Sequence, residues 1–291
     1  MGTPRQLLRG RISVRLSNTD HGAGQPAPHH KGDSMKLGTF LTNLYKAYTS
    51  NNTYVNGAFG VVLKDKQLDR YLTMNDYNKE HAETIKSRAT NFPCFGFDCI
   101  GLIKGLIWGW DGDAEKTYGG AIYESGDIED VNLSKFFTTY CNNITYITKE
   151  SHPSYVGSLL WTSGHIAIYL GCGVAIEATR YGDSKIRFCH VKGIDCPNAS
   201  FLPEREFTAF GVFKLLDSCK IWNWDITYNY MKTGELELPE SPKSYSYLRV
   251  IDADGEVVCI DHSALTETVE TLNFRYPIMI LEEMTTEKDW G

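Results

Sequence analysis

A cysteine stands at the predicted start of a helix where the chain reads Gly96-Phe97-Asp98-Cys99-Ile100-Gly101-Leu102. Residues 100–110 are apolar apart from Lys104 and small glycines, which is typical of a buried helix. Asp98 is a favoured N-cap residue and puts Cys99 at the first helical position. Unpaired N–H groups and the helix dipole stabilise an anion there, so we expect a lowered thiol pKa. Cys99 is therefore a candidate nucleophile.

A base for this thiol is expected at His165, where the chain reads Ser163-Gly164-His165-Ile166-Ala167-Ile168-Tyr169-Leu170-Gly171. Alternation and the Ile and Tyr content predict a strand over 165–170, followed by a Gly-Cys-Gly turn into a second strand. In this hairpin His165 lies beside Glu177, and a carboxylate there fixes the imidazole tautomer and stabilises the imidazolium. Taken singly, each residue has an ordinary interpretation as a hydrogen-bonded or solvated surface group. Together with Cys99 they form a candidate catalytic triad.

The two motifs together resemble the NlpC-type cell-wall cysteine peptidases, which are compact papain-like hydrolases close to the CHAP amidases. The resemblance covers roughly residues 94–215. It implies an α+β, papain-like fold in which N-terminal helices pack on a central antiparallel sheet. It also implies that Cys99 is the nucleophile, His165 the base and Glu177 the third polar residue. No metal or cofactor is required by such chemistry.

Three further residues are candidates for substrate binding. Asp98 and Gly164 directly precede the expected nucleophile and base. Tyr118 lies in a predicted loop, Lys116 to Gly120, although an ordinary loop tyrosine is the alternative interpretation.

The resemblance implies a peptidoglycan hydrolase that cleaves a stem-peptide bond or the muramoyl–alanine amide through a cysteine thioester. Phage-encoded members of the family serve as endolysins or virion-associated wall hydrolases, so bacterial peptidoglycan is the expected partner. The expected location is the host cytoplasm without a signal peptide, with action on the cell wall, or the virion. Two alternatives stay open: a catalytically inert wall-binding or virion structural protein, and a thiol acyltransferase on the same fold.

The chain departs from the family pattern at the oxyanion site. Ile100 replaces the usual serine, which changes packing more than chemistry. Many members carry a tyrosine shortly before the nucleophile that helps to hold the oxyanion, but residues 87–95 contain none. The backbone N–H of Cys99 can supply one oxyanion donor, and the second donor is unassigned.

Length and charge bound the class of protein. A chain of 291 residues allows one large domain or a domain with an appendage. The formal net charge of −7 lacks the basic footprint of a general nucleic-acid binder. No run approaches the roughly 18 apolar residues of a membrane span. The eight scattered cysteines are expected to be reduced thiols rather than a disulfide framework.

Composition divides the chain into four segments. Residues 1–34 are basic and then Gly-Pro-His-rich, and we expect a disordered leader or extension without a secretion signal. Residues 35–220 form the predicted hydrolase domain. Residues 221–243 are a Pro-containing acidic linker. Residues 244–291 are a small β-rich module, for which wall binding, self-association and packing on the hydrolase domain are the open roles.

Within the hydrolase domain the pattern predicts helices first and a sheet second. Helices are expected from Leu37, over about 75–88 and over 131–142. Strands are expected at 157–162, 165–170, 173–178, 186–191 and 207–215. The C-terminal module should contain strands near 245–251, 256–260 and 276–282, and a short helix at 264–272.

Two patterns in the chain are too weak to indicate a metal site. Cys189-His190 with Cys196 lacks the paired spacing of a zinc site. Residues 252–256 read Asp-Ala-Asp-Gly-Glu and resemble part of a calcium loop, but an Asp-Gly hairpin turn is the stronger interpretation.

Overall fold

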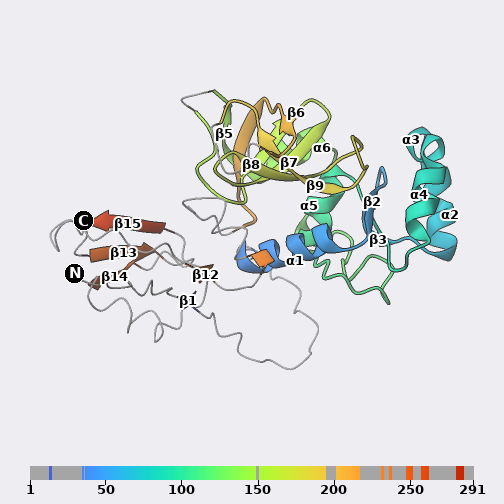
Figure 1. Ribbon diagram of the computed structural model, residues 1–291, viewed down its shortest axis with the longest axis horizontal. Coiled ribbons are helices and arrows are strands. Elements are labelled where there is room, and N and C mark those ends of the chain that lie inside the picture. Colours follow the sequence, from blue (N-terminus) through green and yellow to red (C-terminus); the bar gives the residue numbers. More distant parts are fainter. Residues whose placement is uncertain are drawn as a thin grey trace, which may run out of the picture.

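The computed structural model describes residues 13–14, 35, 37–148, 151–194, 201–216, 231–232, 236–237, 247–251, 257–261 and 280–284. Helices precede a large sheet along this part of the chain, so the predicted α+β class is confirmed (Figure 1). No helix in the described ranges is long and apolar enough to cross a membrane.

The helices lie almost entirely before residue 141. They are α1 (Leu37–Thr49), α2 (Asp65–Met74), α3 (Asp76–Glu80), α4 (Ala82–Ala89), α5 (Cys99–Ile107), α6 (Leu133–Tyr140) and the short 3-10 helix η1 (Ser125–Asp127). The helix expected over 75–88 is in fact the pair α3 and α4, because the chain leaves helical geometry at His81. Helix α2 was not predicted.

A seven-stranded sheet forms the centre of the fold, in the order β10-β9-β8-β7-β6-β11-β5. Its strands are β5 (Cys141–Tyr146), β6 (Leu159–Thr162), β7 (His165–Gly171), β8 (Val174–Ala178), β9 (Ile186–Val191), β10 (Glu204–Arg205) and β11 (Ala209–Phe213). The five predicted strands and the hairpin of β7 and β8 are confirmed. The expectation of a wholly antiparallel sheet is wrong at one edge, where β10 runs parallel to β9.

A second, three-stranded sheet was not predicted, and it carries the start of α5. It consists of β2 (Asn52–Tyr54), β3 (Phe59–Val62) and β4 (Phe95–Phe97), with β4 in the middle. Strand β2 runs parallel to β4, and this register pairs Tyr54 with Phe97. Because β4 ends one residue before Asp98, the register also brings Tyr54 to the point where α5 begins.

Two glycines let α5 lie directly on β3. A Cβ atom at Gly101 would come within 1.9 Å of the Ala58 carbonyl oxygen, and one at Gly105 within 2.4 Å of the Phe59 oxygen. The two positions are four residues apart and so share one face of the helix. Larger side chains there would push the helix, and with it Cys99, away from the sheet.

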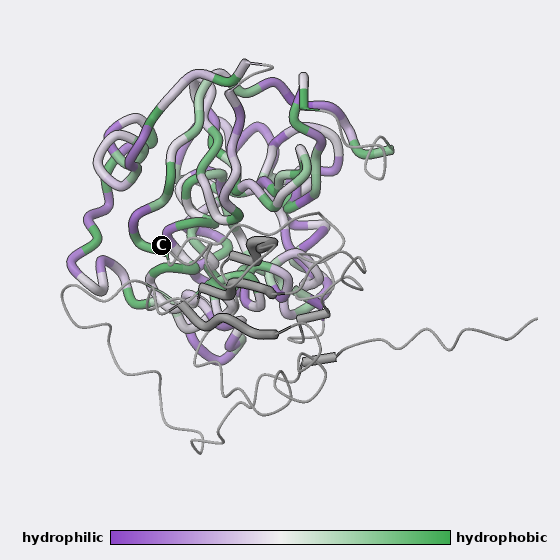
Figure 2. The backbone as a smooth tube through the Cα atoms, turned by 90° about the vertical axis from the view of Figure 1, so that its left-hand side faces the viewer, coloured by the Kyte–Doolittle hydropathy of each residue, from purple (hydrophilic) through white to green (hydrophobic). Residues whose placement is uncertain are grey.

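The strands of the large sheet bury both faces. Ile166, Ile168 and Leu170 of β7 pack in the same core cluster as Leu102 and Leu106 of α5. The alternate residues Ala167 and Tyr169 belong to another cluster on the opposite face, together with Cys189. Figure 2 shows the resulting alternation of hydrophobic and hydrophilic stretches along the chain.

The C-terminal segment contains the expected three strands. They are β13 (Tyr247–Ile251), β14 (Val257–Asp261) and β15 (Ile280–Met284), and β13 pairs with both neighbours in antiparallel fashion. The register of β13 and β14 runs from the pair Tyr247 and Asp261 to the pair Ile251 and Val257. The turn expected at 252–256 and the helix expected at 264–272 lie outside the described residues.

Segments near the predicted domain boundaries make specific contacts. Strand β1 (Ser13–Val14) pairs with β12 (Leu236–Glu237), so a short strand lies within the expected leader. Met35 donates its backbone N–H to the Leu215 carbonyl at 2.8 Å. Met231, which we expected in the linker, is 2% exposed and belongs to the main core cluster. The packed unit therefore reaches past residue 220.

Candidate active site

Asp98 holds the turn from β4 into α5. Its Oδ1 accepts a hydrogen bond from the Gly101 N–H at 2.6 Å, which confirms it as the N-cap of the helix. Its Oδ2 accepts another from the Gly57 N–H at 2.7 Å. The buried carboxylate thus bonds backbone groups with both oxygens. This geometry makes Asp98 the residue that positions the cysteine, rather than a group that reaches for substrate.

Cys99 is the first residue of α5, as predicted, but the expectation of a lowered thiol pKa is wrong. The side chain is nearly enclosed, with 7% of the residue exposed. Burial and the neighbouring Asp98 carboxylate together raise the pKa of Cys99 to about 12, although N–H groups of Ile100 and Ile166 favour the thiolate. Desolvation outweighs the helix N-terminus here. The resting side chain is therefore a neutral thiol.

Tyr54 lies beside the thiol and was missed in the sequence. The Tyr54 hydroxyl forms a side-chain hydrogen bond with Cys99, in the sense that favours the thiolate. Burial, followed by the neighbouring Cys99 and Asp98, raises the pKa of Tyr54, so its hydroxyl stays protonated and can donate. The expected position for such a tyrosine is within residues 87–95, whereas the parallel pairing of β2 with β4 brings in Tyr54 from far upstream.

His165 and Glu177 are directly bonded, as predicted. The Nε2 atom of His165 lies 2.5 Å from Oε2 of Glu177. The imidazole also stacks on Phe207, with ring centroids 6.2 Å apart. Because Nε2 is engaged, Nδ1 is the nitrogen left to exchange a proton with another group.

Glu177 is held as a carboxylate by three cationic or donor side chains. Arg187 Nε donates to its Oε1 at 3.1 Å, and Arg205 Nε donates to its Oε2 at 3.2 Å. Burial alone would raise the pKa of Glu177, but the bond with His165 and the two guanidinium charges lower it below its usual range. The arginines come from β9 and β10, and only the strand order brings them to Glu177.

Backbone contact joins the two halves of the site. The N–H of Ile166, the residue directly after His165, hydrogen-bonds the Cys99 sulfur. The thiol thus lies at the start of β7, the strand that His165 opens. His165 and Glu177 are in direct contact, whereas the described contacts of Cys99 on this strand are with the backbone of Ile166.

Tyr118 and Gly164 are the other two residues that were expected to bind substrate. The Tyr118 ring stacks on Phe59 with centroids 4.7 Å apart, and its hydroxyl meets Arg70 at 3.4 Å. None of the contacts described for Tyr118 involves Cys99 or His165. Gly164 precedes the base at a φ of +75°, and a Cβ atom there would meet nothing within 4 Å. Open space therefore lies over the turn that leads to His165.

A cavity of about 410 Å³ lies between α6 and the strands β5, β6 and β11. It is lined mainly by apolar side chains, including Phe137, Tyr146 and Trp161. Trp161 pairs with Ile166 of the neighbouring strand β7, but neither Cys99 nor His165 lines this cavity.

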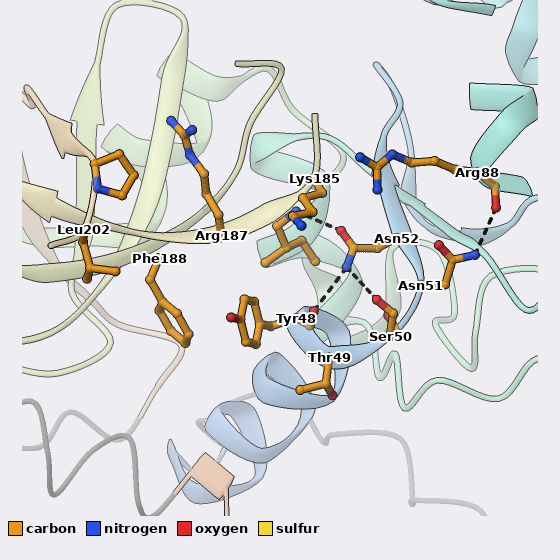
Figure 3. A pocket seen from close by; sticks show the side chains of 12 residues that line it. Tyr48, Thr49, Ser50, Asn51, Asn52, Arg88, Lys185, Arg187, Phe188 and Leu202 are labelled. Carbon is orange, nitrogen blue, oxygen red and sulfur yellow. Dashed lines mark hydrogen bonds between the residues drawn. The ribbon is translucent and has the colours of Figure 1, made fainter. Parts of the chain in front are cut away.

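A second cavity, of about 590 Å³, lies away from the thiol (Figure 3). On its side of β9, the rings of Tyr48 and Phe188 face each other at 4.5 Å, while Arg187 extends away from them. The Asn52 side chain in its wall already has hydrogen-bond partners. The Asn52 amide donates to the carbonyls of Ala47 and Ser50, and its oxygen accepts from the Ile186 N–H. This cavity shares no group with the cysteine site except Arg187.

Of the other described cysteines, Cys94, Cys141 and Cys189 are buried free thiols. Within the described ranges no group of three or more His, Cys, Asp or Glu side chains could hold a metal ion. Cys196, the third member of the weak zinc pattern, lies outside those ranges. Comparison with protein-family models finds no match for this chain, and comparison with curated proteins finds none either.

Proposed function

We propose that this protein is a cysteine hydrolase of papain-like, NlpC-type fold that cleaves an amide bond of bacterial peptidoglycan. One observation carries the proposal. The Cys99 sulfur bonds the Tyr54 hydroxyl and the Ile166 N–H, and the residue before Ile166 is His165, whose imidazole is bonded to Glu177. A nucleophile at the start of the strand that carries a base, with a carboxylate that orients the base, supplies the parts that acyl transfer requires.

The reaction starts from a neutral thiol. His165 Nδ1 takes the thiol proton as the sulfur attacks the scissile carbonyl, and a C–S bond forms. The Cys99 N–H and the Tyr54 hydroxyl donate to the developing oxyanion, so Tyr54 fills the second donor position. His165 then gives the proton to the leaving amine as the C–N bond breaks. In deacylation the neutral imidazole takes a proton from water as hydroxide adds to the thioester carbonyl. The C–S bond then breaks, the carboxylic acid leaves, and the imidazolium returns its proton to the Cys99 sulfur.

The biological setting is part of the same proposal. The substrate amide is a stem-peptide bond or the muramoyl–alanine linkage, as in the family that the motifs resemble. The protein acts on the bacterial wall as a phage endolysin or a virion-associated hydrolase. Residues 244–291 serve wall attachment, self-association or contacts with virion proteins.

Digestion of purified peptidoglycan tests the proposal, with products identified by mass spectrometry. We expect the wild type to release fragments with a new amine and a new carboxyl, and Cys99→Ala to release none. Cys172→Ser is the matched control, since Cys172 is the more exposed thiol, and it should retain activity. Equal release by Cys99→Ala would sink the proposal. Acyl-shifted products without the amine and carboxyl pair would instead identify a transferase, and no product at all would identify an inert binding protein.

A further inference from the structure

A cationic and aromatic surface lies next to the reactive thiol, and the catalytic steps leave it without a role. Tyr181, which is 51% exposed, contacts two guanidinium groups through its ring. Arg180 and Arg205 lie 5.3 and 5.2 Å from the centroid of this ring. Such cation–π contacts hold both arginines against the ring. We call Arg180, Tyr181 and Arg205 the arginine face.

The arginine face adjoins the catalytic residues at both ends. Arg205 bonds Glu177, which in turn bonds His165. At the other end, Arg180 is close enough to Tyr54 to interact with it electrostatically, and the Tyr54 hydroxyl bonds Cys99. A substrate carbonyl above the thiol would therefore have the arginine face beside it.

The charge of the arginine face is only partly neutralised within the described part of the chain. Arg180 forms no ion pair there, and its guanidinium donates to the Tyr181 hydroxyl at 3.4 Å. Neighbouring lysines differ, because Lys185 is paired with Asp183 and Lys192 with Glu206. Arg205 uses Nε for Glu177 and shares that single carboxylate with Arg187. In a protein of net charge −7, a cationic cluster near Cys99 in which Arg180 has no acidic partner among the described residues needs an explanation.

The loop that carries Arg180 is held in place before any ligand arrives. The Tyr54 N–H donates to the Ser184 carbonyl at 2.7 Å, and the Ser184 hydroxyl donates to the Arg180 carbonyl at 2.9 Å. Arg88 donates to the Asp183 carbonyl at 2.5 Å. These bonds tie the loop to β2 and α4, so binding a ligand costs little ordering of the backbone.

We propose that the arginine face binds a free carboxylate of the substrate close to the scissile amide, which makes the preferred substrate an acidic peptide. Guanidinium groups recognise carboxylates through paired N–H donors, and Arg180 and the terminal nitrogens of Arg205 supply them. The Tyr181 ring offers a flat surface for the adjoining peptide. This inference rests on the proposed hydrolase function and specifies its substrate.

Amidation of the substrate carboxylates separates this inference from the hydrolase proposal. Purified peptidoglycan, stripped of attached polymers, is used as such or after its carboxyls are converted to amides. Wild type, Arg180→Gln and Arg180→Lys are compared on both. We expect Arg180→Gln to lower kcat/KM about 10-fold on the acidic material, the loss expected for one charge-assisted hydrogen bond, and to leave the amidated material unaffected. Arg180→Lys should retain part of the wild-type preference for the acidic over the amidated material. Arg205 is not varied, because it also holds Glu177.

Lys79→Gln is the matched control, since Lys79 is an exposed cation on α3. It should leave both rates unchanged, while added salt should lower the wild-type rate on the acidic material only. An equal effect of Arg180→Gln on both materials would overturn the arginine-face proposal and leave the hydrolase intact. If the wild type is inactive on both materials, the hydrolase proposal is overturned instead.

Discussion

At the scale of single residues, Cys99 shows how two opposing effects on one thiol are decided by magnitude. A helix N-terminus stabilises a charge by about 0.3–1 kcal/mol at an exposed position. Burial of an ionisable group shifts its pKa by several units, and each unit is worth about 1.4 kcal/mol. Cys99 is almost fully enclosed, so burial prevails and the thiol keeps its proton. Deprotonation must therefore accompany attack on the substrate.

Alkylation of Cys99 should follow this raised pKa. Because the thiolate is the reactive form, the rate with iodoacetamide should be low near neutral pH and rise through the alkaline range. The midpoint should lie above the roughly 8.5 of a free thiol. Mass spectrometry of the Cys99 peptide measures the rate at each pH, with the unfolded chain as reference. A rate that is already at its plateau below pH 7 would contradict the neutral resting thiol.

Replacement of Tyr54 tests its part in holding the oxyanion. Tyr54→Phe removes the hydroxyl but keeps the ring, which packs edge-on against Tyr77 at 5.4 Å. Loss of one oxyanion donor lowers kcat about 100- to 1,000-fold, and we expect a loss of this order with little change in KM. Tyr118→Phe is the matched control and should change neither constant. A Tyr54→Phe enzyme with wild-type kcat would leave the second donor unassigned.

At the scale of elements, the contact between α5 and β3 sets the position of Cys99. Gly101 and Gly105 allow the helix backbone to approach β3, and Asp98 ties the helix start to Gly57. The hairpin of β7 and β8 then supplies His165 and Glu177 from the sheet. The site therefore depends on two independent packings, helix against β3 and helix against β7.

Gly101→Ala should damage the protein through the first of these packings. The added Cβ would lie 1.9 Å from the Ala58 carbonyl oxygen, so helix and strand must separate. Overpacking of this kind costs about 1–3 kcal/mol of unfolding free energy, and displacement of Cys99 should also lower kcat. Chemical denaturation and product release measure the two effects. Ser87→Ala on the exposed face of α4 is the control, and equal stability of the two variants would disprove the packing argument.

At the scale of the whole molecule, the site is assembled from segments that are distant in sequence. Tyr54 and Cys99 come from the N-terminal half of the described chain, while His165, Glu177 and Arg205 come from the large sheet. The core that joins the two halves also includes Met231, which composition had placed in the linker. The packed unit therefore extends beyond the boundary predicted at residue 220.

Met231→Ala tests this extension in the full-length chain. Truncation of a buried methionine costs about 2–5 kcal/mol of unfolding free energy, and Met231 is 2% exposed. Lys232→Ala changes the exposed neighbour and should leave stability nearly unchanged. Thermal denaturation of both variants measures the difference. Similar midpoints for Met231→Ala and Lys232→Ala would show that residues near 231 do not support the core.

Local chemistry was enough to locate Cys99, its Asp98 cap, the β7–β8 hairpin and the pairing of His165 with Glu177. These features depend on neighbours in sequence or on one tight turn, and periodicity and cap preferences report such short-range order well. The α+β class follows from the same patterns. The NlpC-type family, the reaction and the substrate remain proposals.

Tertiary structure alone decided the surroundings of the thiol. The parallel pairing of β2 with β4 brings in Tyr54, and strand order brings Arg187 and Arg205 onto Glu177. Burial reverses the expected direction of the Cys99 pKa shift. Pairing between distant strands and the enclosure of a side chain depend on the packing of the whole chain. No pattern local to residues 96–102 carries that information.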